Sequence, residues 1–185
     1  MPASDVSAPP NNFLRRFLRD RRGTSAVEFA LVALPFFALL FAIIEVCIFF
    51  FASQLLESAI QDSGRLLFTH QAQDNGWTAQ QFKDDICPRV AVMMNCEKVY
   101  VDVKYYPADQ IITINDPISG GKFDGSGPKY LPPTAGSNGT VVARVFYAWP
   151  LFVTGAGFNI SNMTDDSGMQ KMRLLAGTYA FHVEP

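Results

Sequence analysis

Two glutamates, Glu28 and Glu45, interrupt a long apolar run and have the clearest capacity for chemistry in this sequence. A carboxylate at the centre of a bilayer costs about 2.5–3.5 kcal/mol, and somewhat less near an edge, so such a side chain usually has a partner. A cut between Gly23 and Thr24 would give Thr24 an α-amino group, which is mostly cationic at neutral pH because its ordinary pKa is about 7.7–8. The amine of a neighbouring copy could then neutralise Glu28 as helices stack side by side. The alternatives are that Glu28 reaches the water at the membrane edge and that the chain is not cut.

Glu45 follows Glu28 by 17 positions. That separation is about 25 Å along a helix. Glu45 is therefore expected near the opposite membrane interface, either among lipid headgroups or paired with another subunit. Cys47, close by, is expected to be a small apolar side chain that fills space.

Other residue patterns that would support catalysis or ligand binding are missing. The two histidines, His70 and His182, are too few and too far apart to predict a metal site or a catalytic triad. The glycine-rich stretch 119–127 lacks the spacing of a phosphate-binding loop, and the pair Asp165-Asp166 follows no calcium-loop pattern. The net charge of −2 argues against a nucleic-acid partner. We therefore expect no enzymatic activity, no cofactor and no metal.

The apolar run itself predicts a membrane-spanning helix. Residues 29–44 carry no charge, and the whole stretch 24–52 covers about 29 positions. A bilayer core needs roughly 20 residues of helix. A core helix of a small soluble domain would show a polar face, and a cleaved signal peptide would have a shorter apolar region. We therefore expect a transmembrane helix over residues 24–52.

The basic residues predict the orientation of this helix. No lysine or arginine follows it before Arg65, whereas five arginines precede it: Arg15, Arg16, Arg19, Arg21 and Arg22. Because positive residues stay on the cytoplasmic side, residues 1–23 are expected to form a basic cytoplasmic leader. The chain from about residue 53 onward is expected to be exported. In a bacterium this describes a single-pass inner-membrane protein with its C-terminal domain in the periplasm.

The junction between leader and helix resembles a known processing site. Arginines, then Gly23, then small residues, with Glu28 at the fifth place and the aromatic Phe29 at the sixth, are similar to the type IV prepilin-like site. The string Gly-Thr-Ser-Ala-Val-Glu-Phe, followed by Ala-Leu-Val-Ala-Leu-Pro-Phe, resembles the TadE-like family of tight-adherence (Tad/Flp) pilus proteins. The resemblance covers about residues 15–70 and weakens beyond them.

That resemblance implies a minor pilin, or pseudopilin, because the chain is much longer than a major Flp pilin. A prepilin peptidase would trim it between Gly23 and Thr24, and Glu28 would be the acid carried over from the family. Phe29 stands where the major pilin carries a tyrosine. The implied partners are other pilin-like subunits and the Tad secretion platform in the inner membrane, besides the lipid bilayer.

Beyond the membrane the pattern predicts an α+β fold, with a long helix packed on a small antiparallel sheet. Apolar residues at helical spacing continue the helix as an amphipathic stalk over residues 53–70, and Pro35 is expected to bend the helix. Residues 71–185 then form the periplasmic domain. Short helices are expected within 78–94, with Thr78 as a cap and Pro88 as a break.

The strand signals come later in the chain. Alternation of apolar and polar residues predicts a half-buried strand over residues 99–105. Further strands are expected at 110–115, 140–149 and 171–183, the last with a possible bulge at Gly177. Residues 118–138 and 154–168 are expected to be loops.

Cys87 and Cys96 lie nine positions apart in the exported part. An oxidising compartment favours a disulfide between them, and closing so short a loop is worth slightly under about 3 kcal/mol. The alternative is two free thiols, since a zinc site would need more ligands nearby.

Two functions of different classes fit these observations. The first is a minor pilin that helps to assemble a Tad pilus for adhesion by lateral helix packing, whether it stays in the membrane or enters the fibre. The second is an unprocessed membrane anchor that presents a periplasmic binding domain, and it predicts that Gly23→Ala and Glu28→Ala are tolerated.

Overall fold

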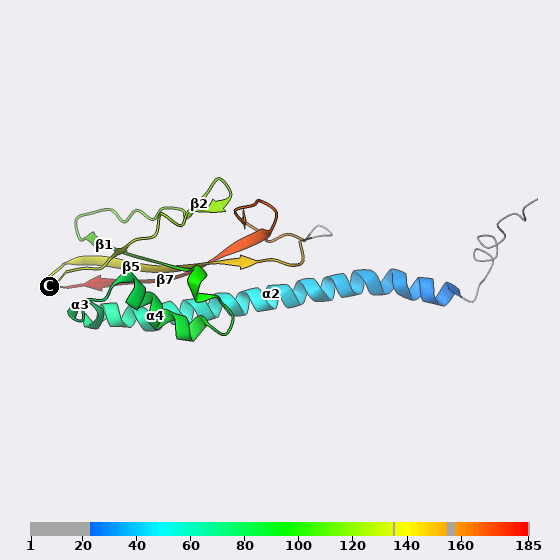
Figure 1. Ribbon diagram of the computed structural model, residues 1–185, viewed down its shortest axis with the longest axis horizontal. Coiled ribbons are helices and arrows are strands. Elements are labelled where there is room, and N and C mark those ends of the chain that lie inside the picture. The colour runs from blue at the N-terminus through cyan, green and yellow to red at the C-terminus, as the bar shows by residue number, and fades with distance from the viewer. Residues whose placement is uncertain (1–22, 135, 155–157, 185) are drawn as a thin grey trace, which may run out of the picture. The chain divides into compact units, whose positions relative to one another are not determined.

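The structure is a computed structural model that describes residues 23–134, 136–154 and 158–184. The leader arginines Arg15, Arg16, Arg19, Arg21 and Arg22 lie outside these residues. The chain divides into two compact units, Met1–Phe41 and Ala42–Pro185. Figure 1 traces the helices and strands in chain order by colour.

A single helix, α2 (Thr24–Phe68), begins where the apolar run begins. It continues through Pro35, and the bend expected there stays a prediction. The stalk was expected to end near His70, and α2 ends two residues earlier. His70 has a φ of 61°, a left-handed conformation that turns the chain into the short helix α3 (Gln71–Asp74). The expected continuous helix is therefore confirmed, with its end shifted by this turn.

From Ala42 onward α2 has a buried face. The buried positions recur at intervals of mostly three and four residues, which places them on one side of a helix. These residues are Ala42, Glu45, Phe49, Ala52, Leu56, Ala59, Ile60, Ser63, Gly64 and Leu67. The packing partner is a β-sheet, whose core residues Val103, Val145 and Leu175 are almost fully buried.

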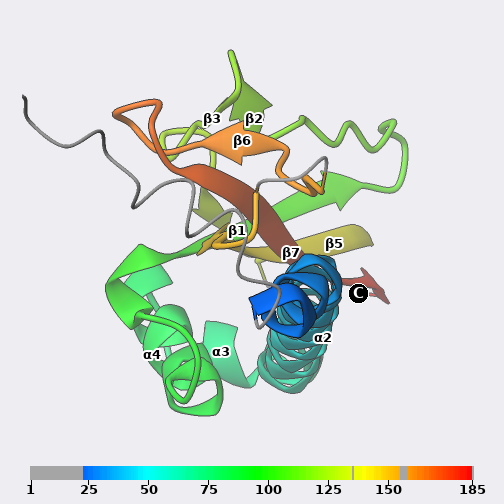
Figure 2. The same ribbon diagram turned by 90° about the vertical axis from the view of Figure 1, so that its right-hand side faces the viewer.

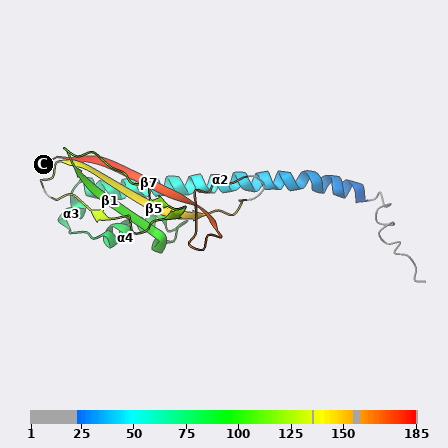
Figure 3. The ribbon, with the colours of Figure 1, turned by 90° about the horizontal axis from the view of Figure 1, so that it is seen from above.

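Three long strands form the sheet (Figure 3): β1 (Val99–Pro107), β5 (Gly139–Pro150) and β7 (Lys171–Val183). β5 lies in the middle and pairs antiparallel with both neighbours. Short strands complete the order β4-β1-β5-β7-β6, and a separate hairpin joins β2 to β3. The short strands are β2 (Ile118–Ser119), β3 (Lys122–Phe123), β4 (Tyr130–Leu131) and β6 (Met163–Thr164). They lie in the two segments expected to be loops, and β4 pairs parallel with β1.

The strand expected at residues 110–115 is wrong. The segment is irregular and exposes Ile111, Ile112 and Ile114. β1 pairs instead with β5, through nine residue pairs. The physical reason is burial, because β5 is covered on both faces along most of its length, and an apolar strand gains most at the centre of a sheet.

Helices cover one face of this sheet. In Figure 2, α2, α3 and α4 lie on one side, and the β2-β3 hairpin lies on the other. Helix α4 (Ala79–Val90) starts with a capping box between Thr78 and Gln81, as the sequence predicts for Thr78. The break expected at Pro88 is wrong, because α4 continues to Val90. The fold is α+β, a long helix packed on a small, mainly antiparallel sheet.

The bulge expected at Gly177 is also wrong, since its pairing with Val145 is in continuous register. A Cβ atom at this position would lie 3.0 Å from the carbonyl oxygen of Leu56 and 3.2 Å from Cα of Glu57. The glycine therefore lets β7 approach the backbone of α2, and Gly64 similarly makes room for the ring of Tyr179.

Replacing Gly177 by alanine is expected to destabilise the domain by about 1–3 kcal/mol, because the helix backbone cannot move aside at low cost. Thermal unfolding of the full chain in detergent measures this change. Ala176→Val on the exposed face of the same strand is the matched control and should change stability by less than about 0.5 kcal/mol. Equal effects of the two substitutions would contradict the close-approach role of Gly177.

Candidate functional site

The first half of α2 exposes a continuous apolar surface. Its large side chains point outward on all sides, and Phe29 is 72% exposed. The exposed residues between Thr24 and Phe41 include Val27, Phe29, Leu31, Val32, Leu34, Phe36, Phe37, Leu39, Leu40 and Phe41. Within the described residues, α2 is the one helix that is long and apolar enough to cross a membrane. A lipid environment or neighbouring helices would bury this surface.

The predicted processing residues lie at the start of this helix. Thr24 is its first residue, and Gly23 precedes it with open space where a Cβ would be. Glu28 is exposed, and it makes no hydrogen bond or ion pair with any other described residue. Phe29 lies beside it. The structure thus gives these residues the geometry of an exposed helix terminus, whose processing and pairing stay predictions.

Glu45, by contrast, is buried inside the domain. Its carboxylate accepts hydrogen bonds from the backbone N–H groups of Phe152 and Val153, the latter at 3.1 Å to each carboxylate oxygen. The sequence analysis expected Glu45 to lie among lipid headgroups or to pair with another subunit. It did not predict hydrogen bonds within the chain. The signal that could have found it is the spacing, because Glu45 shares the buried face of α2 with Ala42, Phe49 and Ala52.

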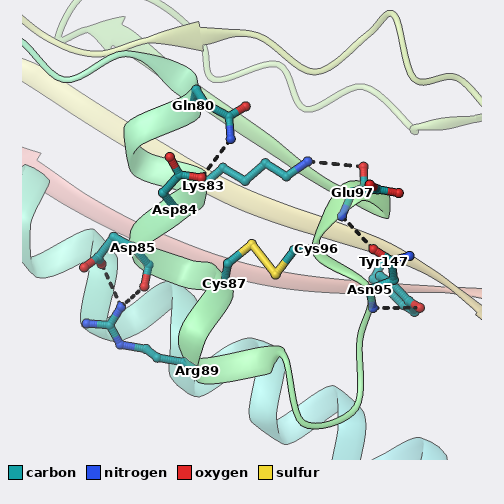
Figure 4. Close-up of a disulfide and its surroundings, with 10 residues drawn as sticks. All are labelled: Gln80, Lys83, Asp84, Asp85, Cys87, Arg89, Asn95, Cys96, Glu97 and Tyr147. Atoms are coloured by element: carbon teal, nitrogen blue, oxygen red, sulfur yellow. Dashed lines mark hydrogen bonds and ion pairs between the residues drawn. A yellow bond between two sulfur atoms is a disulfide. The ribbon is translucent and has the colours of Figure 1, made fainter.

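A disulfide joins Cys87 near the end of α4 to Cys96 in the short helix η2 (Cys96–Lys98), with Cα atoms 5.6 Å apart (Figure 4). It holds the end of α4 against the segment that leads into β1. Cys47 is a free cysteine on the exposed side of α2, where it does not fill the interior.

A second set of contacts fixes α4 to α2. The buried Ser63 hydroxyl of α2 donates to the carboxylate of Asp85 at 2.7 Å. Arg89 forms a 2.8 Å ion pair with the same carboxylate and also donates to the backbone oxygen of Asp85. The Ser63–Asp85 bond thus joins α4 to α2, and the disulfide joins α4 to the segment before β1.

A buried ion pair links the other face of the sheet to a long loop. Asp102 and Arg144, only 1% and 8% exposed, meet through two hydrogen bonds of 2.6 and 3.0 Å. Asp102 also accepts from the backbone N–H of Lys129, and Arg144 donates to the carbonyl oxygen of Asn115. The sequence pattern put Asp102 on a polar, solvent-facing side of β1, but this loop covers it. A cavity of about 110 Å³ remains beside the pair.

The remaining acidic residues of interest stabilise turns. The Ser126 hydroxyl donates to Asp124, and the Ser167 hydroxyl donates to Asp165. These bonds hold the pKa of each carboxyl below its usual range. Among the described residues, no three His, Cys, Asp or Glu side chains group in a way that could hold a metal ion.

Comparison with known proteins gives one family. Residues 23–65 match the family described as TadE-like protein, which confirms the resemblance seen at the junction and along α2. No curated protein matches the chain, and no solved structure matches it.

Proposed function

We propose, from the TadE-like match over residues 23–65, that this chain is a minor pilin that takes part in assembly of a Tad pilus. It would act by lateral packing of its N-terminal helix with the helices of other pilin-like subunits in the inner membrane. The C-terminal domain would lie in the periplasm and would have no enzymatic activity.

The observation that carries this proposal is where the helix is exposed. The matched segment begins at Gly23 and includes the exposed apolar residues of α2 from Val27 to Phe41. The domain uses the buried face of α2 only from Ala42 onward. The first half of the helix is therefore available for lipid and for neighbouring helices.

The proposed assembly step is charge pairing in a medium of low dielectric. Removal of residues 1–23 would leave a cationic α-amine on Thr24. The Glu28 carboxylate of a neighbouring subunit would form an ion pair with this amine. The ion pair would lower the free-energy cost of placing each charged group in the bilayer. The same pairing orders the helices laterally, because amine and carboxylate lie within the first turns of each helix.

The length of the mature chain tests this proposal. The intact mass of the protein, extracted from membranes of cells with an active prepilin peptidase, should correspond to residues 24–185, and N-terminal sequencing should begin at Thr24. Cells that lack the peptidase are the control and should yield the uncut chain. A mature protein that still begins at Met1 in both strains would support the unprocessed anchor instead.

A further inference from the structure

We propose that the chain directly after β5, residues 151–154, places the ring of Phe152 in the outer leaflet of the membrane and that Glu45 holds this segment there. This inference rests on the proposed membrane anchoring of α2. Its ligand is a lipid surface, recognised by an exposed aromatic ring at the hydrocarbon boundary.

This segment is fixed to the helix by its backbone. β5 ends at Pro150, and Leu151 is buried. The next two N–H groups, of Phe152 and Val153, both donate to the Glu45 carboxylate. Satisfied backbone donors are a condition for placing irregular chain near hydrocarbon, where each unsatisfied group costs several kcal/mol. The same bonds give the buried Glu45 carboxylate two hydrogen-bond donors.

The position of Glu45 along α2 puts this segment at the membrane surface. Within the expected span of residues 24–52, the uncharged run 29–44 ends directly before Glu45. Thr24 and Ser25 are polar, and the roughly 20 residues that cross a bilayer core, counted from Ala26, end at Glu45. The chain that Glu45 holds therefore lies at the boundary between hydrocarbon and headgroups. Aromatic side chains favour that boundary.

The side chains at this level fit such a surface. Phe152 is 79% exposed although its backbone is held firmly. Ile44, Ile48 and Phe51 of α2 are also exposed. The half-buried guanidinium of Arg173 lies 5.4 Å from the ring centre of Phe49 and donates to the carbonyl oxygen of Ile160.

Lipid fits these residues better than a protein partner. Ile44, Ile48 and Phe51 of α2 are exposed apolar residues within one or two helical turns of Glu45, so Phe152 adds to a surface that the proposed anchoring places against lipid.

A fluorescent probe tests the insertion. The environment-sensitive dye NBD is attached at Phe152→Cys in the full chain, with Cys47→Ser removing the free thiol and the disulfide kept intact. The protein is placed in nanodiscs of phosphatidylethanolamine and phosphatidylglycerol. We expect a blue-shifted emission that lipids carrying a nitroxide near the headgroup quench strongly. The matched control is the same dye at Ile111→Cys, which is 89% exposed and follows the opposite end of the sheet, and it should not be quenched.

A second variant tests the role of Glu45. Glu45→Ala removes the acceptor of both N–H groups, and quenching at position 152 should fall, whereas Glu45→Gln keeps one acceptor and should retain more of it. Resistance of the unsubstituted chain to carbonate extraction reports separately on the anchor. An anchored protein whose label at 152 resembles that at 111 would overturn this inference alone. A protein released by carbonate would overturn the proposed anchoring as well.

Discussion

Glu28→Gln should leave the chain in the membrane but lower its association with other pilin-like subunits by about 10- to 100-fold. The amide has nearly the shape of the carboxylate but no charge, so the proposed pairing with a neighbour's Thr24 amine would be lost. A loss of about 1.4–2.8 kcal/mol in helix–helix association corresponds to this range. The measurement is the amount of pilin-like subunit that co-purifies with the tagged chain from membranes, together with pilus counts by electron microscopy.

The matched control is Asp62→Asn, which removes a charge from the same helix beyond its apolar run. Asp62 is 60% exposed, and its carboxylate lies 3.9 Å from the Arg89 guanidinium. An exposed ion pair at this distance contributes little to stability. We expect this variant to assemble like the parent chain. Undiminished association of Glu28→Gln, in a chain shown to begin at Thr24, would remove the charge-pairing step from the proposal.

Asp102→Ala is expected to lower the free energy of unfolding by about 3–5 kcal/mol, because it leaves the buried Arg144 without its partner. The loop that contacts this pair through Lys129 and Asn115 should loosen with it. For a chain of this size the loss corresponds to a decrease of about 10 °C in Tm. Thermal unfolding of the full chain in detergent, followed by circular dichroism, measures it.

Two controls separate a buried charge from a general effect. Asp109→Ala removes an exposed carboxylate and should stay within about 0.5 kcal/mol of the parent. The double variant Asp102→Val, Arg144→Met replaces both charges with apolar groups and should be less destabilised than Asp102→Ala alone. If the double variant loses as much stability as the single variants Asp102→Val and Arg144→Met together, the pair does not act as a unit.

These two variants probe different parts of the molecule. Glu28 lies on a helix surface that the described residues leave uncovered, so its effect should appear in association and not in folding. Asp102 lies in the interior of the domain, so its effect should appear in folding first. We expect Glu28→Gln to lower assembly without lowering the free energy of unfolding, and Asp102→Ala to lower that free energy first. These two results together would show that the helix surface and the domain can be altered separately.

The sequence by itself determined the features that depend on local pattern. The start of α2 at Thr24 follows from the long apolar stretch 24–52, and the helix cap at Thr78 follows from its residue type. The last strand was predicted with its bounds at Lys171 and Val183, because alternation and β-branched or aromatic residues are local signals. The TadE-like resemblance likewise rested on a contiguous string.

The tertiary structure alone decided which distant residues meet. Glu45 was expected at an interface because it lies about 25 Å beyond Glu28 along the helix, but its partners lie more than 100 positions later. Gly177 was expected to form a bulge, yet its role depends on how close α2 approaches. Segment 110–115 has the composition of a strand, but β5 buries more apolar surface beside β1. Periodicity reports which face of an element is apolar, and it cannot report what covers that face.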